Sequence, residues 1–86
     1  MRRSKLQIYV AVLDALAVCG PMKLTRITYK ANLSHNMLKP VLKYLIENGL
    51  VEVRKLDKNI VVYAATNTAR KTLIALKEFS QVLPLI

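Results

Sequence analysis

The sequence predicts a mainly α-helical domain with a small β-hairpin, an α+β class of fold. Four segments carry apolar residues at the spacing of amphipathic helices, and two β-branched runs flank a three-residue loop at 57–59. A chain of 86 residues corresponds to a single domain, residues 1–86. The expected order of elements is helix, short strand, helix, helix, strand, strand, helix.

The first helix is predicted to begin at Ser4, because Ser4 and Gln7 have the spacing of a capping box. Gly20-Pro21 ends it, since glycine adopts a left-handed cap and proline cannot continue the hydrogen bonding. Two apolar stripes run along this helix, so it must be covered on two sides. The stripe expected in the core contains Leu6, Tyr9, Val10, Leu13, Leu16 and Ala17, and the second contains Ile8, Val12, Ala15 and Cys19.

Residues 22–34 predict a short strand, a second helix and a tight turn. The run MKLT at 22–25 has extended character, and Thr25 can cap a helix from Arg26 to Ala31. In the turn that follows, Leu33 is expected to pack inward and Ser34 to cap a third helix. Two short helices joined by a turn of this length form a helix-turn-helix.

The third helix is predicted over 35–47 and ends at Asn48-Gly49. Pro40 lies in its interior, and the bend is expected to fall away from the core, where water can hydrate the carbonyl of Asn36. One arc of this helix is apolar (Leu38, Val41, Leu42, Leu45 and Ile46), and the opposite arc is polar (Asn36, Lys39, Lys43 and Glu47).

Residues 50–56 and 60–64 predict the two strands of a hairpin with a basic tip, in which Asn59 can take a positive φ. Thr66 can cap a last helix, which Pro84 ends. Its apolar residues follow the 4-3 spacing of an association helix, so residues 66–84 are expected to contribute to dimerisation.

The composition restricts the classes of function. The formal net charge of +9 indicates polyanionic partners, and ribosomal or membrane-surface proteins share this charge. With one His, one Cys and five carboxylates, no metal cluster or catalytic dyad is expected, and neither is a cofactor or an enzyme activity. Cys19 is expected to be a small buried hydrophobe. No run is long and apolar enough for a membrane span, so a cytoplasmic, nucleoid-associated location is predicted.

The order of elements, with ANLSHNMLKPVLKYLIENGLVEV at its centre, resembles the winged helix-turn-helix family. Over residues 2 to about 80, the chain is similar to the small, ten-kilodalton archaeal winged-helix proteins, a nucleoid-associated and transcription-regulator-like group. That resemblance implies dimerisation through the C-terminal helix, although the last helix here is shorter than in that group. PadR-type regulators look similar at Pro40.

An α-helix fits the major groove of DNA, and the N-terminal half of the second helix of a helix-turn-helix normally reaches the base edges. The candidates for base contacts are His35, Asn36, Lys39 and Lys43, although such residues also form an ordinary solvated face. The candidates for phosphate contacts are Arg2, Arg3, Lys5, Lys23, Thr25, Arg26, Tyr29, Lys30, Ser34, Arg54, Lys55, Lys58 and Asn59. Tyr29 and Tyr44 are equally suited to packing on the core edge.

The predicted function is that of a homodimeric transcription regulator bound to double-stranded DNA. The first and last helices carry more apolar surface than one subunit can cover, and two-fold pairing would bury it. The interface candidates are Ile8, Val12, Ala15, Cys19, Leu73, Leu76, Phe79, Ser80, Val82, Leu83 and Ile86. Two alternatives remain open: an architectural nucleoid protein with little sequence preference, and a winged helix that binds another protein. No small-molecule ligand is indicated.

Overall fold

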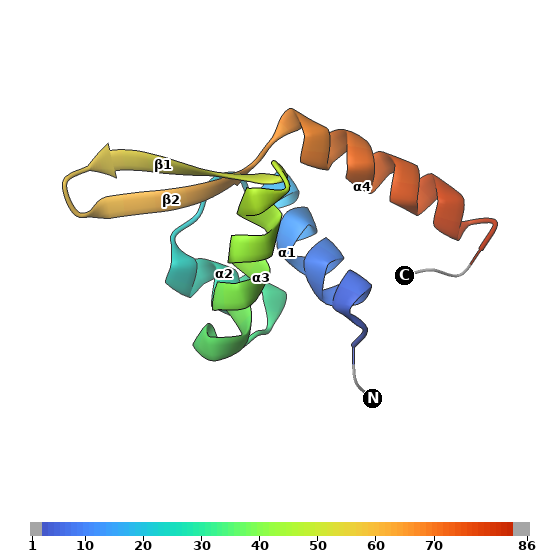
Figure 1. Cartoon of the computed structure of the whole chain (residues 1–86), viewed down its shortest axis with the longest axis horizontal. Helices are drawn as coiled ribbons and strands as arrows, with labels where there is room; N and C mark the ends of the chain where they lie inside the picture. The colour runs from blue at the N-terminus through green and yellow to red at the C-terminus, as the bar shows by residue number, and fades with distance from the viewer. Residues whose placement is uncertain (1–2, 84–86) are drawn as a thin grey trace.

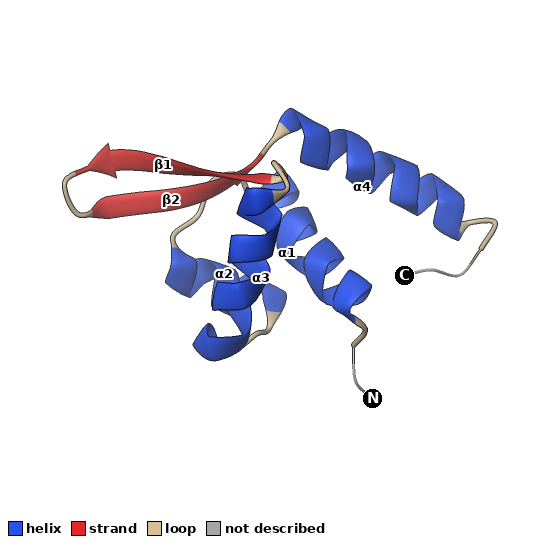
Figure 2. Cartoon of the chain, in the orientation of Figure 1, coloured by secondary structure: helices blue, strands red, loops and turns tan. Residues whose placement is uncertain are grey.

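The computed structural model describes residues 3–83 of the chain and contains four helices and a two-stranded antiparallel sheet. In Figures 1 and 2, α1–α3 gather in the middle, the hairpin projects to one side and α4 extends to the other. The elements are α1 (Lys5–Cys19), α2 (Leu24–Ala31), α3 (His35–Glu47), β1 (Val51–Asp57), β2 (Ile60–Ala65) and α4 (Asn67–Ser80).

The structure confirms the predicted bounds of α1. Ser4 Oγ accepts a hydrogen bond from the backbone N–H of Gln7 at 3.1 Å, and Gln7 Oε1 accepts one from the N–H of Ser4 at 2.8 Å. At the other end, Gly20 has a φ of +84° and donates its N–H to the carbonyl of Leu16. A side chain is disfavoured at this φ, which is why glycine stands at the end of the helix.

The predicted first strand is reduced to a single bridge. Met22 and Tyr63 exchange two backbone hydrogen bonds of 3.0 and 2.8 Å, and the chain enters α2 two residues later. Lys23, in an extended conformation, is therefore the N-cap of α2, and the expectation that Thr25 caps this helix is wrong. Thr25 instead lies within the first turn of α2. Because α2 begins at Leu24, the segment that starts at Met22 is too short to form a second backbone pair with β2.

The turn between α2 and α3 contains the one positive-φ residue other than glycine within 3–83, Asn32, with a φ of 55°. The expectation of a positive φ at Asn59 is wrong. A register shift between Lys55 and Asp57 shapes the hairpin tip instead, and Asp57 Oδ1 accepts a hydrogen bond from the N–H of Lys58. Ser34 caps α3 as predicted, because its Oγ accepts from the N–H of Met37 at 3.2 Å.

The core lies where α1, α2 and α3 meet the base of the hairpin and the first half of α4. Its least exposed large side chains are Leu16, Ile27, Leu38, Leu45 and Val12. The core arc predicted for α3 is correct at Leu38, Leu42 and Leu45, whereas Pro40 is exposed on the opposite side. Val12, predicted at a dimer interface, is 0% exposed and belongs to the core of its own subunit.

Three expectations about α1 and α4 are wrong. Cys19 is exposed rather than buried, because it lies beside Val18 and Lys30 at a surface groove of about 340 Å³. The last helix ends at Ser80 with Gln81 as C-cap, several residues before the predicted end at Pro84, which lies outside the described residues. Leu73 of α4, a second predicted interface residue, is 4% exposed and packs in the core.

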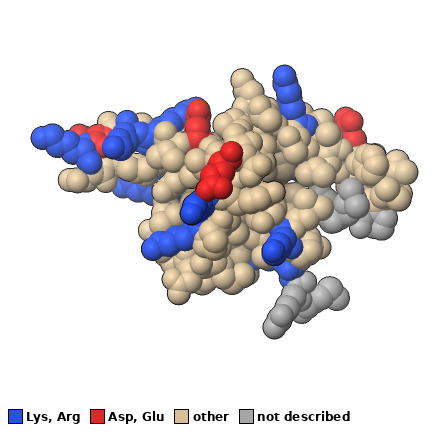
Figure 3. Space-filling model, in the orientation of Figure 1, with Lys and Arg blue, Asp and Glu red and all other residues tan. Residues whose placement is uncertain are grey.

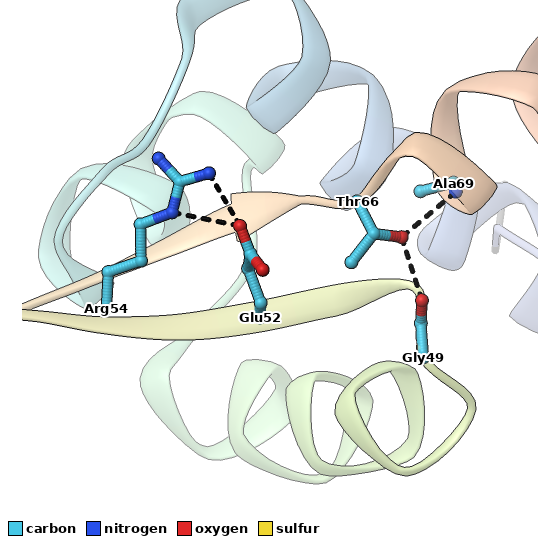
Figure 4. Close-up of polar contacts among 5 residues, drawn as sticks. All are labelled: Gly49, Glu52, Arg54, Thr66 and Ala69. Atoms are coloured by element: carbon cyan, nitrogen blue, oxygen red, sulfur yellow. Dashed lines mark hydrogen bonds and ion pairs between the residues drawn. The ribbon is translucent and has the colours of Figure 1, made fainter.

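α4 is held to the rest of the fold by polar contacts at three positions. Lys77 Nζ lies 2.8 Å from Asp14 Oδ1, and Arg70 Nη1 donates to the carbonyl of Ala17 at 3.2 Å. Thr66 caps α4 as predicted, accepting from the N–H of Ala69 at 3.1 Å, and its hydroxyl also donates to the carbonyl of Gly49 at 2.8 Å (Figure 4). These contacts fix α4 beside α1 and at the junction of α3 with the hairpin.

Candidate nucleic-acid interface

The polar face of α3 is open to solvent along its length. All four side chains predicted to contact bases, those of His35, Asn36, Lys39 and Lys43, are exposed. The helix presents them because Leu38, Leu42 and Leu45 hold its opposite face in the core. α3 therefore offers a convex, largely unpaired polar surface of the size that a major groove admits.

A groove of about 390 Å³ runs between α3, the start of α2 and β2. Lys39 and Lys43 line one side of it, with Tyr63 of β2 and Leu24 of α2 among the other lining residues. Glu47 also reaches this groove and reduces its positive charge. The groove shows that the side of the hairpin carrying Tyr63 is the side that meets the cationic face of α3.

The strand register divides the hairpin side chains between two faces. Residues directly opposite each other in an antiparallel pair share a face, and successive residues alternate. Lys55 pairs with Val61 and Val53 with Tyr63, so Lys55 lies on the face that meets α3. Arg54 pairs with Val62 and lies on the reverse face, so the structure brings only one of these two predicted phosphate contacts to α3.

On the reverse face of the hairpin, Arg54 forms an ion pair with Glu52 of the same strand. Arg54 Nε donates to Glu52 Oε1 at 2.9 Å, and both side chains are about half exposed. Figure 4 shows the two side chains rising from the side of β1 that faces away from α3. Arg54 is thus partly neutralised and lies on the face away from α3, the face of Val62, which lines the groove of Lys23 and Arg26.

Most of the exposed Lys and Arg side chains lie on the hairpin and the helices next to it, and a few lie elsewhere. In Figure 3, Lys and Arg side chains gather over the projecting hairpin, with further single cations over the helices. Between Lys23 and Lys58 the chain carries eight Lys and Arg residues against three carboxylates. Lys58 and Asn59 form the exposed hairpin tip. The hairpin and the adjoining helices therefore form the more cationic part of the molecule.

The candidates on α2 separate into two groups. Lys23, Thr25, Arg26 and Tyr29 line one groove of about 580 Å³ beside β2. Lys30 lines a different groove, together with Asp14 and Val18 of α1. The structure therefore does not bring Lys30 together with the other four. Tyr29 is 82% exposed, so its ring does not pack on the core edge.

The N-terminal candidates lie near the start of α3. Arg3 Nη2 donates to the carbonyl of Asn32 at 2.7 Å, and Lys5 borders a groove of about 220 Å³ next to Pro40. Arg2 lies outside the described residues. The ring of Tyr44 stacks on that of Tyr9 with centroids 4.9 Å apart, and this pair joins the outer side of α3 to α1. Sequence reasoning could not pair these rings, because their contact depends on how the two helices cross.

The predicted interface residues of α1 and α4 differ in exposure. Phe79, Val82 and Leu83 are 56%, 82% and 48% exposed. Cys19 is exposed as well, and Ile86 lies outside the described residues; Ile8, Ala15, Leu76 and Ser80 are half-buried. Two exposed apolar residues outside the predicted interface set, Val18 of α1 and Ile74 of α4, are 77% and 59% exposed and line a common groove of about 300 Å³.

Within residues 3–83 no group of three or more His, Cys, Asp or Glu side chains is placed to hold a metal ion. Over the same residues, no helix has the length and apolarity required to cross a membrane.

The family model described as winged helix-turn-helix matches residues 2–83, whereas no curated protein sequence matches the chain. RosR from H. salinarum is a similar solved structure at 25% identity and a TM-score of 0.76, with 85% of this chain and 71% of that chain covered. A MarR family regulator from Neisseria meningitidis has 26% identity and a TM-score of 0.69, with coverages of 90% and 56%.

Sso10a-2, a DNA-binding protein from Sulfolobus solfataricus, has the same fold, with a TM-score of 0.77 at 20% identity and coverages of 93% and 81%. The chain spans little more than half the length of the Neisseria regulator. The solved structures of similar fold therefore include both longer regulators and a small DNA-binding protein.

Proposed function

This chain belongs to the winged helix-turn-helix family, and from that premise we propose that it is a homodimeric transcription regulator that binds double-stranded DNA. In this proposal α3 lies in the major groove, with His35, Asn36, Lys39 and Lys43 directed at base edges. The hairpin lies over the neighbouring backbone, with Lys55 and Lys58 near phosphates. A cytoplasmic, nucleoid-associated location goes with this function.

One observation supports the DNA-binding surface above all others. Lys39 and Lys43 project from α3 into the groove that Tyr63 lines, and Lys55 lies on the same hairpin face as Tyr63. Three cations from two elements thus share one side of the molecule. Phosphate contacts supply much of the affinity for DNA and also fix the register of the helix in the groove.

The exposed apolar residues of α1 and α4 support the homodimer. Val18 of α1, Ile74 and Phe79 of α4, and Val82 in the turn after α4 are all more than half exposed, and the hairpin points away from α4 (Figure 1). Val18 and Ile74 line one groove, and contiguous exposed apolar surface marks sites of contact with other proteins. A two-fold dimer would place two α3 helices on one side of a duplex, with half-sites about one helical turn, ~34 Å, apart.

The double variant Lys39→Ala plus Lys43→Ala tests the DNA-binding surface. We expect its affinity for a labelled duplex to fall at least about tenfold, and the slope of log affinity against log salt to become shallower by about 2, as two counterions fewer are released. The control, Lys71→Ala, removes an exposed cation from α4 and leaves both quantities nearly unchanged. Affinity that is independent of salt, or equal in all three proteins, would contradict the proposal.

A second candidate is an architectural nucleoid protein with little sequence preference. It is favoured by the net charge of +9 and by the few side chains on α3 that can read bases. Selection of bound duplexes from random sequence separates the two functions. A regulator enriches a defined site, and an architectural protein enriches none.

The alternative from another class, a winged helix that binds a protein, gives a different result with the same double variant. In that case DNA affinity stays unchanged and binding to the protein partner is lost.

A further inference from the structure

The end of the hairpin carries an apolar side chain that the fold does not use. Leu56 is 66% exposed. The register pairs Lys55 with Val61 and Asp57 with Ile60, so Leu56 is the extra residue of a bulge and has no partner across the sheet. Bulges redirect side chains near sheet ends, and this one leaves a leucine free at the tip of a projecting element (Figure 1).

The surroundings of Leu56 are cationic. Lys55 precedes it in β1, and Lys58 follows in the turn, where the N–H of Lys58 donates to Asp57 Oδ1 at 2.7 Å. Every residue from Glu52 to Asn59 is exposed, and the apolar residues nearest to Leu56 across the hairpin, Ile60 and Val61, lie outside the core. A large apolar side chain between two lysines, beyond the reach of the core, gives the isolated subunit no packing contribution.

We propose that Leu56 is a wedge that enters the minor groove of bound DNA and partly unstacks one base step, so that the duplex bends. This inference rests on the proposed DNA binding and adds an effect on DNA shape. Apolar wedges kink duplexes in this way, most easily at pyrimidine–purine steps such as TA. The phosphates that flank a minor groove attract Lys55 and Lys58, and those contacts draw the tip toward the bases.

The position of Leu56 along the hairpin supports this assignment. Val53, two residues before Lys55 on the same face, is 46% exposed and lies closer to α3, where it can contact the sugar edges. Leu56 lies farther out, at the point where the regular ladder ends. The hairpin therefore combines cations for phosphates with one apolar side chain at its extremity, as a wedge requires.

The test uses an A·T-rich duplex with a donor and an acceptor dye at its ends and 2-aminopurine at its TA steps. With saturating wild-type protein we expect energy transfer to rise as the ends approach, and 2-aminopurine fluorescence to increase by at least about twofold on unstacking. Leu56→Ser abolishes both changes and lowers affinity by no more than about tenfold. Leu56→Met keeps an apolar wedge and retains both changes.

Several outcomes would overturn the wedge. Energy transfer and fluorescence could be equal for wild type and Leu56→Ser, or the wild type could bind and leave the duplex straight. Alternatively, Leu56→Ser could change the oligomeric state of the free protein, which would assign the leucine to a contact between subunits. The proposed function fails separately, and the wedge with it, if the wild type binds no duplex. Thermal unfolding of the three proteins should agree closely, because residue 56 is exposed.

Discussion

Lys55 and Arg54 are neighbours in β1 but lie on opposite faces of the hairpin. Lys55 shares the face of Tyr63, which meets α3, whereas Arg54 lies on the reverse face and is paired with Glu52. The two faces of the hairpin therefore differ in net positive charge. The side that meets α3 has an unpaired lysine, and the other side has an ion pair.

Lys55→Ala is expected to weaken DNA binding more than the double variant Glu52→Ala plus Arg54→Ala. Loss of one phosphate contact should lower affinity several-fold at low salt and reduce the salt slope by about 0.9. Removal of the ion pair leaves the net charge unchanged and should alter neither quantity. Anisotropy titrations at two salt concentrations measure both. Equal losses in the two variants would show that the strand faces do not decide DNA contact.

Substitutions at Ser34 should change the DNA affinity and the thermal stability of the protein independently. Ser34→Asp retains a cap for the N–H of Met37 and places a negative charge at a helix N-terminus, so thermal stability should be unchanged or higher. The same charge would repel a phosphate near the start of α3, so DNA affinity should fall by about tenfold or more. The matched control is Ser34→Asn, a neutral cap. Its affinity should stay close to that of the wild type, and a loss as large as with Asp would remove charge as the cause.

Thr66→Ala is expected to destabilise the subunit by about 1–2 kcal/mol, because one hydroxyl caps α4 and also binds the carbonyl of Gly49. Thr66→Ser keeps the hydroxyl and should lose much less. Urea unfolding with an unchanged denaturant slope measures the difference. Identical stability of the Ala and Ser variants would mean that water replaces both bonds without cost.

Phe79→Glu is expected to dissociate the proposed dimer without unfolding the subunit, since this ring is 56% exposed. A buried charge in place of an aromatic contact should raise the dimer dissociation constant by at least about tenfold. Sedimentation over a range of protein concentrations provides the measurement. Leu56→Glu serves as a control, because it places the same charge at an exposed apolar position on the hairpin. A wild type that sediments as a monomer at all concentrations would exclude the homodimer.

The fold was predictable where the signals were local. The capping box at Ser4 and Gln7, the cap at Ser34 and the cap at Thr66 lie within the elements they start, and the structure confirms each. The apolar arc of α3 was predictable because a single helix face shows its periodicity in the sequence. The start of α2 was missed, because the Met22–Tyr63 bridge, a contact between distant residues, determines where the chain turns.

The candidate site was only partly predictable for a related reason. Helical periodicity identified the exposed side chains of α3, but it could not decide which stripe of α1 the other helices cover. Val12, which belongs to the stripe predicted for the dimer interface, is buried in its own subunit, whereas Tyr9 and Val10 of the predicted core stripe are only half-buried. The choice depends on how α1, α2 and α4 cross.

The sequence by itself determined the class of fold, most helix ends and the cationic character, because caps, periodicity and charge depend on residues close together in the chain. The tertiary structure decided which side chains share a surface. It put Lys55 on the hairpin face that meets α3 and Arg54 on the reverse face, and it left Leu56 outside the ladder. Strand register and helix crossing set these positions, and both come from packing between segments that are far apart in sequence.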